Sequence, residues 1–203
     1  MKLYNSIGPN PQVVRTFMAE RGVTLDMEEI DIQAGANRQA DFLKVNPAGQ
    51  LPALVMTDGT ILSEITAICE YLDDVSGTSS LIGETAEDRA RTRQWTRWVD
   101  LNICEPLANG FRFSEGLAMF ENRMRCLPDA APGLKACAQD KLGWLNDNWN
   151  GRAFIAGDNF TLADILLFSF LAFGEVVGQP LDRSRTHVAA WFDKVKQRPS
   201  AAA

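Results

Sequence analysis

Every segment of this chain with the length and pattern of a β-strand lies before residue 76, and this division constrains the fold most. Partly apolar runs at residues 2–6 and 24–32 flank a helical pattern, and residues 51–56 and 60–62 flank Asp58-Gly59. An Asp-Gly pair between two apolar runs is a short-range signature of a β-hairpin. The apolar spacing after residue 84 is helical throughout. The sequence therefore predicts a βαβ-ββα domain followed by an all-α domain.

The segment that joins the two predicted domains is rich in Ser, Thr and Gly. We place the first domain at residues 1–76, a linker at 77–84 and the helical domain at 85–203. Thr85 and Asp88 have the spacing of a helix N-terminal capping box, and Pro106 is expected to kink the long helix that follows. A chain of 203 residues has the length for two such unequal domains.

The scarcity of imidazole and the spacing of the thiols limit the chemistry. His187 is the one histidine in the sequence, which excludes a Ser-His-Asp or Cys-His nucleophile and a histidine-rich metal site. The four cysteines form neither a CxxC pair nor a metal-ligand spacing, so we expect buried free thiols and no metal.

Charge and hydropathy exclude two classes of partner. The net charge of −6 leaves no basic surface for nucleic acid or for an anionic membrane. No apolar run approaches the roughly 18 residues that a membrane span needs, and the first residues carry no signal-peptide core. We expect a cytoplasmic protein that binds neither nucleic acid nor membrane.

The dipeptide Asn10-Pro11 is interpreted as the start of the first helix. Asn is a favoured N-cap, and Pro is favoured at the first helical position because that residue makes no intrahelical N–H bond. A helix N-terminus stabilises an anion such as a thiolate through free N–H groups and partial positive charge. Asn10 either serves this purpose or merely caps the helix.

Two further positions suit a peptide ligand. Leu51-Pro52 directly precedes the hairpin, and a cis peptide bond there would turn the backbone of Leu51 outward to pair with an extended peptide. Glu64 begins the helix after the hairpin, where its carboxylate can pair with an ammonium group while backbone N–H groups bind a carboxylate. The alternative for Glu64 is an ordinary acid in the first turn of a helix.

Residues 160–165 combine two devices that start a helix. Thr161 and Asp164 have the spacing of a capping box, and Phe160 and Ile165 that of a hydrophobic staple. We expect Asp164 to be buried and to serve folding, not catalysis.

Together these segments resemble the glutathione transferase superfamily, over nearly the whole chain. The similar segments are Met1-Lys2-Leu3-Tyr4, Pro9-Asn10-Pro11 with Val14-Arg15, residues 46–54, Glu64-Ile65-Thr66-Ala67-Ile68 with Tyr71-Leu72, residues 160–165, and Arg198-Pro199-Ser200. The resemblance implies the fold of that family, an α/β thioredoxin-like N-terminal domain plus an all-α C-terminal domain. It also implies that glutathione is the cosubstrate.

The resemblance assigns roles in glutathione binding to one group of residues. Leu51 with Pro52 would hold the cysteinyl backbone of glutathione, and Gln50 its glycyl end. Glu64 and the Ile65 N–H would hold its γ-glutamyl head. Relatives usually carry Ser where Ile65 stands, so a hydroxyl contact is missing while the backbone N–H is kept.

The thiolate would lie at the start of the first helix, where the sequence departs from the family. Relatives usually carry Ser, Cys or Thr just ahead of the Pro-Asn pair, whereas Gly8 stands there in this chain. Asn10, nearby backbone N–H groups and Ser6 are therefore the candidates that stabilise the thiolate.

For the second substrate, the resemblance implies an electrophile site lined by Ile7, Arg112 and Phe113. It also implies a homodimer, in which Asp100 could reach across the interface. Attack of glutathione on a small hydrophobic electrophile is the favoured function. Two others stay open: a disulfide or peroxide reductase in which bound glutathione supplies every thiol, since no cysteine precedes Cys69, and a non-catalytic binding module.

Overall fold

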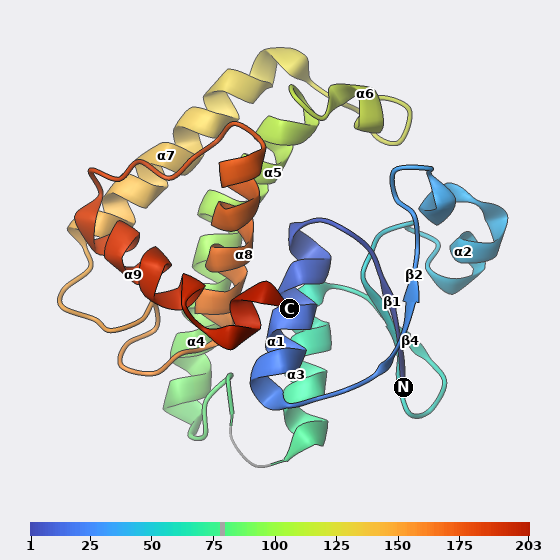
Figure 1. The fold of residues 1–203 in the computed structure, drawn as a ribbon, viewed down its shortest axis with the longest axis horizontal. Helices are drawn as coiled ribbons and strands as arrows, with labels where there is room; N and C mark the ends of the chain where they lie inside the picture. The colour runs from blue at the N-terminus through green and yellow to red at the C-terminus, as the bar shows by residue number, and fades with distance from the viewer. Residues whose placement is uncertain (78–79) are drawn as a thin grey trace. The chain divides into compact units, whose positions relative to one another are not determined.

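The computed structural model describes residues 1–77 and 80–203, which form two compact units (Figure 1). The first unit comprises Met1–Leu81 with Ala202–Ala203, and the second comprises Ile82–Ala201. Residues 78 and 79 of the predicted linker lie outside the described residues. The predicted fold class, an α/β domain followed by an all-α domain, is confirmed.

The first unit is built on a four-stranded mixed sheet. Its strands are β1 (Lys2–Asn5), β2 (Asp26–Glu29), β3 (Ala53–Val55) and β4 (Ile61–Leu62), in the order β2-β1-β3-β4. β1 runs parallel to β2 and antiparallel to β3, so Leu3 lies opposite both Met27 and Leu54. The predicted hairpin is confirmed, because β3 and β4 pair antiparallel around the turn at Gly59.

Helices α1 (Pro9–Arg21) and α3 (Ile65–Ser76) lie side by side in the first unit (Figure 1). Their C-terminal ends are joined by a buried ion pair, in which Arg21 Nε lies 2.9 Å from Asp73 Oδ1 and both side chains are at most 4% exposed. Ser80 Oγ and the Leu81 N–H also donate to Asp73. Between β2 and β3 the chain forms a 3-10 turn, η1 (Ala36–Arg38), and the short helix α2 (Ala40–Val45).

The second unit contains helices and short helical turns. Its elements are α4 (Ala86–Val99), the π-helical segment η2 (Asp100–Cys104), α5 (Glu105–Arg112), α6 (Leu117–Phe120), η3 (Pro128–Ala130), α7 (Ala131–Asp147), α8 (Leu162–Val176), α9 (Thr186–Lys196) and the turn η4 (Pro199–Ala202), which ends in the first unit. The capping box predicted for Thr85 and Asp88 starts α4. Among the described residues, no helix combines the length and apolarity of a membrane span.

The interruption predicted at Pro106 takes the form of a π-turn immediately before it. The Glu105 N–H donates to the Asp100 carbonyl five residues earlier. Because proline has no N–H and its ring crowds the carbonyl of the preceding turn, an α-helical turn cannot close normally there. The wider turn of η2 carries the chain past this position into α5.

Asp164 is fully buried at the start of α8, as predicted. Its carboxylate accepts hydrogen bonds from the Ile155 N–H at 2.9 Å, the Thr161 N–H at 2.9 Å and Trp191 Nε1 at 2.8 Å. Burial raises the pKa of this carboxyl to about 6, and the hydrogen bonds from Ile155, Thr161 and Trp191 oppose the shift. Asp164 therefore joins α8 to the preceding loop and to α9.

Candidate functional site

Helix α1 starts earlier than the sequence predicted, and the interpretation of Asn10 as its N-cap is wrong. Pro9 is the first helical residue and Gly8 is the N-cap, with φ 112° and ψ 172°. A Cβ at Gly8 would meet nothing within 4 Å, so the backbone conformation and not space favours glycine there. Pro9 suits the first helical position as well as Pro11 would, and Asn10 becomes the second helical residue.

The two prolines leave Asn10 as the main donor at this helix end. Pro9 and Pro11 have no N–H, and the Gln12 N–H is bonded to the Gly8 carbonyl. The Asn10 N–H is one of the first-turn donors that an α-helix cannot pair internally. Its side chain is partly exposed and has no hydrogen-bond partner among residues 1–77 and 80–203. A backbone and a side-chain donor are thus available at one residue, at the positive end of α1.

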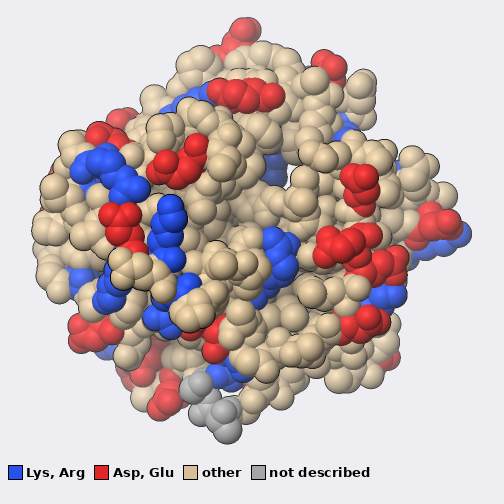
Figure 2. Space-filling model, in the orientation of Figure 1, with Lys and Arg blue, Asp and Glu red and all other residues tan. Residues whose placement is uncertain are grey.

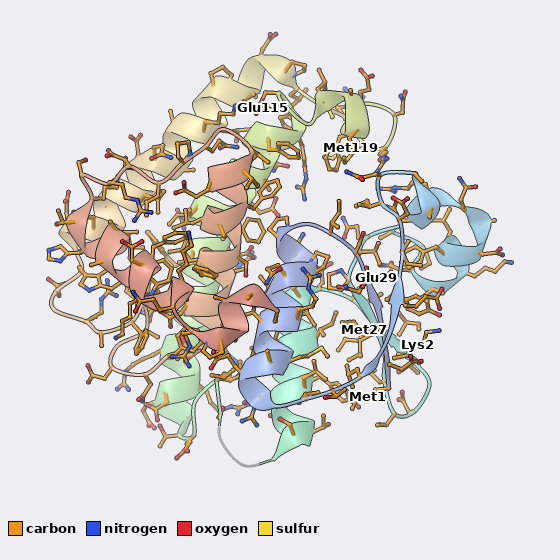
Figure 3. The ribbon with its side chains drawn as sticks, in the orientation of Figure 1. Met1, Lys2, Met27, Glu29, Glu115 and Met119 are labelled. Atoms are coloured by element: carbon orange, nitrogen blue, oxygen red, sulfur yellow. The ribbon has the colours of Figure 1, made fainter. Side chains whose placement is uncertain are left out.

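Ser6, the other candidate that could stabilise the thiolate, is hydrogen-bonded within the protein. Its side chain belongs to a residue only 3% exposed, and Oγ donates to the Ile30 carbonyl at 2.7 Å. Arg15 Nη1 holds the same loop by donating to the Ser6 carbonyl at 2.9 Å and to Asn5 Oδ1 at 3.0 Å. Asn5 in turn donates to Glu29, labelled in Figure 3. Because the Ser6 proton is already engaged, Asn10 is the better placed donor.

The predicted cis peptide bond between Leu51 and Pro52 is confirmed. Leu51 is 8% exposed, and neither its N–H nor its C=O is hydrogen-bonded to another residue that the structure describes. Gln50, just before it, is exposed, and its carbonyl accepts from Asn46 Nδ2 at 2.9 Å. An unpaired N–H and C=O beside β3 can be completed by an extended peptide.

Glu64 is the N-cap of α3 and has a strained backbone. Its φ is 70° and its ψ is 116°, in a region that side-chain-bearing residues rarely adopt. Its carbonyl accepts the first helical N–H, from Ile68 at 2.9 Å, and Ile65 begins the helix. The exposed carboxylate has no hydrogen-bond or ion-pair partner within the described part of the chain. A strained residue with a free charge at a helix N-terminus is typical of a binding site.

The residues predicted for the electrophile site are divided between the two units. Ile7 is 57% exposed and lies in the first unit. Arg112 ends α5 in the second unit, where Nη1 donates to Asn109 Oδ1 at 2.9 Å. Phe113 follows it and is 8% exposed. Each therefore has a defined place within its own unit.

Two residues of η1 that contact the segment before Leu51 were not predicted from the sequence. Asn37 Nδ2 donates to the Gly49 carbonyl at 2.6 Å, and Arg38 Nη1 donates to the Ala48 carbonyl at 3.2 Å. The only signal in the sequence was that Asn37 and Arg38 are adjacent polar residues in a weakly patterned stretch. Their role depends on a contact with Gly49, 12 residues after Asn37, which the sequence pattern does not indicate.

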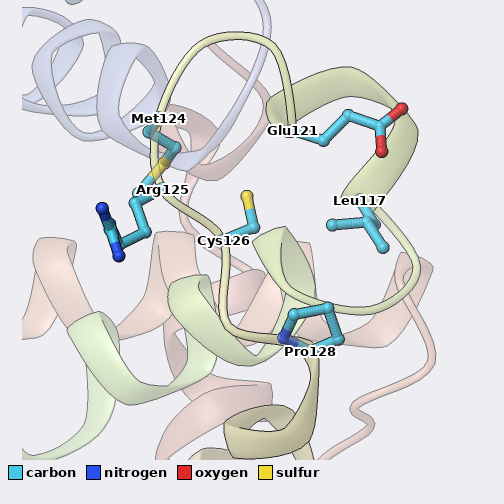
Figure 4. A pocket seen from close by; sticks show the side chains of 6 residues that line it. All are labelled: Leu117, Glu121, Met124, Arg125, Cys126 and Pro128. Atoms are coloured by element: carbon cyan, nitrogen blue, oxygen red, sulfur yellow. The ribbon is translucent and has the colours of Figure 1, made fainter.

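Two hollows in the structure have no predicted site residue in their lining. One, of about 470 Å³, is lined by residues of α6, of η3 and of the loop between them, and Cys126 in this loop is one of them (Figure 4). The other, of about 390 Å³, has Tyr4 and Phe42 in its wall, in edge-to-face contact at 5.8 Å. On the face drawn in Figure 2, acidic and basic side chains are interspersed. No group of three or more His, Cys, Asp or Glu among the described residues could hold a metal ion.

Comparison with known proteins gives consistent matches in both units. Residues 7–75 match the family model described as glutathione S-transferase, N-terminal domain, and residues 137–199 match the one described as glutathione S-transferase, C-terminal domain. Glutathione S-transferase 2 of Saccharomyces cerevisiae is 28% identical over 200 residues, which cover 95% of this chain and 84% of that protein. Glutathione S-transferase 3 of Zea mays is 31% identical over 209 residues, covering 98% and 90%.

Solved structures agree with these matches. The structure of a glutathione S-transferase domain-containing protein from Marinobacter aquaeolei VT8 has a TM-score of 0.92 and 32% sequence identity to this chain. The match covers 98% of this chain and 99% of that one. The resemblance of the sequence and the two-unit fold therefore lead to the same family.

Proposed function

This chain belongs to the glutathione S-transferase family, and from that premise we propose that it activates the glutathione thiol for attack on a small hydrophobic electrophile. The observation that carries the proposal is the start of α1, where Asn10 presents a first-turn N–H and a side-chain amide that has no partner among the residues the structure describes. Donors at the positive end of a helix favour the thiolate over the thiol. The protein would contribute orientation and electrostatic stabilisation.

The peptide backbone of glutathione would pair with Leu51. The N–H and C=O of Leu51 have no partner among the described residues and lie beside β3 at the cis Pro52. The tripeptide would add to them as a short antiparallel strand. Its glycyl carboxylate would then approach Gln50 and the exposed guanidinium of Arg38, which is hydrogen-bonded to the same loop.

The γ-glutamyl head would be held at the N-terminus of α3. Its ammonium group would pair with the exposed carboxylate of Glu64, and its carboxylate would accept from the Ile65 N–H. Both charges of an α-amino acid are satisfied in this arrangement. Ile65 offers no hydroxyl, so one hydrogen bond that a Ser would make is absent, and we expect weaker glutathione binding than in relatives that carry Ser.

In the proposed reaction the bound thiol releases its proton to water, and the thiolate is stabilised by Asn10. The sulfur then forms a bond to an electrophilic carbon, and the leaving group departs with the electron pair of the broken bond. Ile7, Arg112 and Phe113 would contact the electrophile. Cys69 takes no part, because it is fully buried and burial raises the pKa of its thiol well above the usual value.

We further propose that the protein is a homodimer. The ring centroids of Trp98 in α4 and Trp144 in α7 lie 4.9 Å apart. Leu101 in η2 follows Trp98 by three residues, a spacing that places both on one helical face, and we propose that the three side chains form one apolar surface. Leu101 is 49% exposed and Trp144 is 45% exposed, which is unusual for large apolar side chains on one surface. Asp100 lies next to Leu101 and would contact the partner.

Two measurements test the proposed function. Calorimetric titration with glutathione should give saturable heat at millimolar ligand, and no heat would contradict both enzymatic functions and leave the binding module. Assays with an aromatic halide, a small disulfide and an organic peroxide then separate the reactions. Turnover of the halide supports conjugation, whereas turnover of the disulfide or peroxide alone replaces it with glutathione-dependent reduction.

A further inference from the structure

Asn37 is a buried amide whose nitrogen is hydrogen-bonded and whose oxygen accepts no hydrogen bond within the described part of the chain. The residue is 3% exposed, and its Nδ2 donates to the Gly49 carbonyl at 2.6 Å. Its Oδ1 is buried and accepts no hydrogen bond from another described residue. A buried acceptor without a donor costs free energy, so an apolar side chain would pack there at lower cost. The contact with Gly49 is therefore the feature that an amide supplies and an apolar residue cannot.

The Cα of Gly49 also lies close to η1. Its φ is 62°, and a Cβ built there would lie 2.9 Å from the Asn37 carbonyl oxygen and 3.0 Å from Arg38 Nη1. Only glycine combines this backbone conformation with so close an approach. The Asn37 side chain and backbone thus fix the position of Gly49 from two directions.

The side-chain amides of two buried residues, Asn37 and Asn46, hold two successive peptide planes of the loop before Pro52. Asn37 Nδ2 binds the Gly49 carbonyl, and Asn46 Nδ2 binds the Gln50 carbonyl at 2.9 Å. Because a peptide unit is planar, fixing the Gly49 carbonyl also fixes the Gln50 N–H, and fixing the Gln50 carbonyl also fixes the Leu51 N–H. Asn37 therefore fixes the peptide plane through which the chain enters Gln50, and Asn46 fixes the next plane, between Gln50 and Leu51.

We propose that Asn37 is a positioning residue for glutathione, acting through the Gly49 carbonyl to orient Gln50, and through Gln50 the adjoining Leu51, toward the tripeptide. The inference rests on the proposed function, in which these two residues hold the glycyl and cysteinyl parts of the ligand. Asn37 lies on a different segment from Asn10, so it acts on affinity and not on the stabilisation of the thiolate. If a substitution of Asn37 weakens glutathione binding but leaves kcat unchanged, Asn37 positions the ligand and does not serve folding alone.

The test compares Asn37→Ala with wild type and with Ser169→Ala. Ser169 Oγ donates to the Ile165 carbonyl at 2.9 Å, so this control loses a buried side-chain-to-backbone hydrogen bond in the second unit. The dissociation constant for glutathione is measured by calorimetry below the melting temperature of each variant, and KM and kcat are measured with an aromatic halide. For Asn37→Ala we expect the dissociation constant and the KM for glutathione to rise about fivefold to tenfold, the effect of one lost hydrogen bond. Its kcat at saturating glutathione should stay within about twofold of wild type.

Gly49→Ala disturbs the same contact from the loop side and should weaken binding in the same way. If Asn37→Ala does not fold, Asn37→Ser, whose side chain is too short to reach Gly49, replaces it. An Asn37 variant that melts earlier but binds glutathione as tightly as wild type would overturn the inference. Wild-type protein that gives no heat with glutathione would overturn the proposed function itself, and the inference with it.

Discussion

Asn10 and Glu64 are ordinary polar residues in the sequence, and the backbone around each one determines which hydrogen bonds or charges it can offer. Asn10 stands between two prolines that cannot donate, so the donor capacity at the start of α1 is concentrated on it. Glu64 adopts a φ of 70°, which a residue with a side chain holds only at a cost of about 1–3 kcal/mol. In both cases the local geometry leaves a polar group that the proposed ligand can bind.

Asn10→Ala tests the first of these residues. The substitution removes the side-chain amide and keeps the backbone N–H, so we expect kcat to fall about tenfold or more while the KM for glutathione changes less, since the amide acts on the thiolate. The pKa of bound glutathione, followed by thiolate absorbance, should rise. Gln12→Ala in the same helix is the control. An unchanged kcat in Asn10→Ala would move the role to a backbone N–H or to Ser6.

Glu64→Gly tests the second residue through its backbone. Glycine adopts the observed φ without strain, so the free energy of unfolding should stay equal or rise by up to about 1 kcal/mol, while glutathione binding is lost with the carboxylate. Glu64→Gln is the matched control, which removes the charge and keeps the strain. Chemical denaturation and calorimetry measure the two effects. A clearly destabilised Glu64→Gly would show that the strain argument is wrong.

At the scale of elements, α8 depends on the buried carboxylate at its start. Asp164 connects the α8 N-terminus with the Ile155 N–H and with Trp191 of α9. Burial and the hydrogen bonds act on its pKa in opposite directions, and burial has the larger effect, giving a pKa of about 6. The unfolded-state carboxyl titrates near 3.8. The folded state therefore binds the proton more tightly than the unfolded state.

This difference predicts how the stability that Asp164 contributes changes with pH. Because the folded pKa is the higher one, the contribution is fully present below about pH 4 and is lost as the pH rises through about 6. Compared with Asp164→Asn, which does not titrate, the wild-type free energy of unfolding should decline by on the order of 2–3 kcal/mol between these values. Urea denaturation of both proteins from pH 4 to 7 measures it. If the free energy of unfolding of wild type, relative to that of Asp164→Asn, rises with pH instead, the hydrogen bonds to Asp164 outweigh its burial.

At the scale of the whole molecule, the sequence predicted the order and type of the elements because each has a local signal. The hairpin at Asp58-Gly59, the capping boxes at Thr85 and Thr161, and the interruption before Pro106 all follow from residues close in sequence. The starting residue of α1 was misjudged by two positions, because two prolines satisfy the same helical preference and the φ of Gly8 decides between them.

The supporting contacts of the site could not be predicted in the same way. Asn37 meets Gly49 and Ser6 meets the Ile30 carbonyl only after the chain has folded back on itself. The strain at Glu64 likewise has no local signature, since glutamate gives no indication of a positive φ. Local patterns thus predict where the candidate ligand-binding residues lie, and contacts distant in sequence decide which of their polar groups are already hydrogen-bonded within the described part of the chain.

The proposed homodimer is the prediction that concerns the whole molecule. Leu101→Glu places a charge in the surface formed by Trp98, Leu101 and Trp144, next to Asp100, and a buried unpaired charge is strongly unfavourable in an interface. We expect wild-type protein to elute as a dimer, and the variant as a monomer, in size-exclusion chromatography with light scattering. Val176→Glu, at an apolar residue that is 80% exposed, should leave the dimer intact. A monomeric wild type would contradict the homodimer, and a dimeric Leu101→Glu would place its interface on another surface.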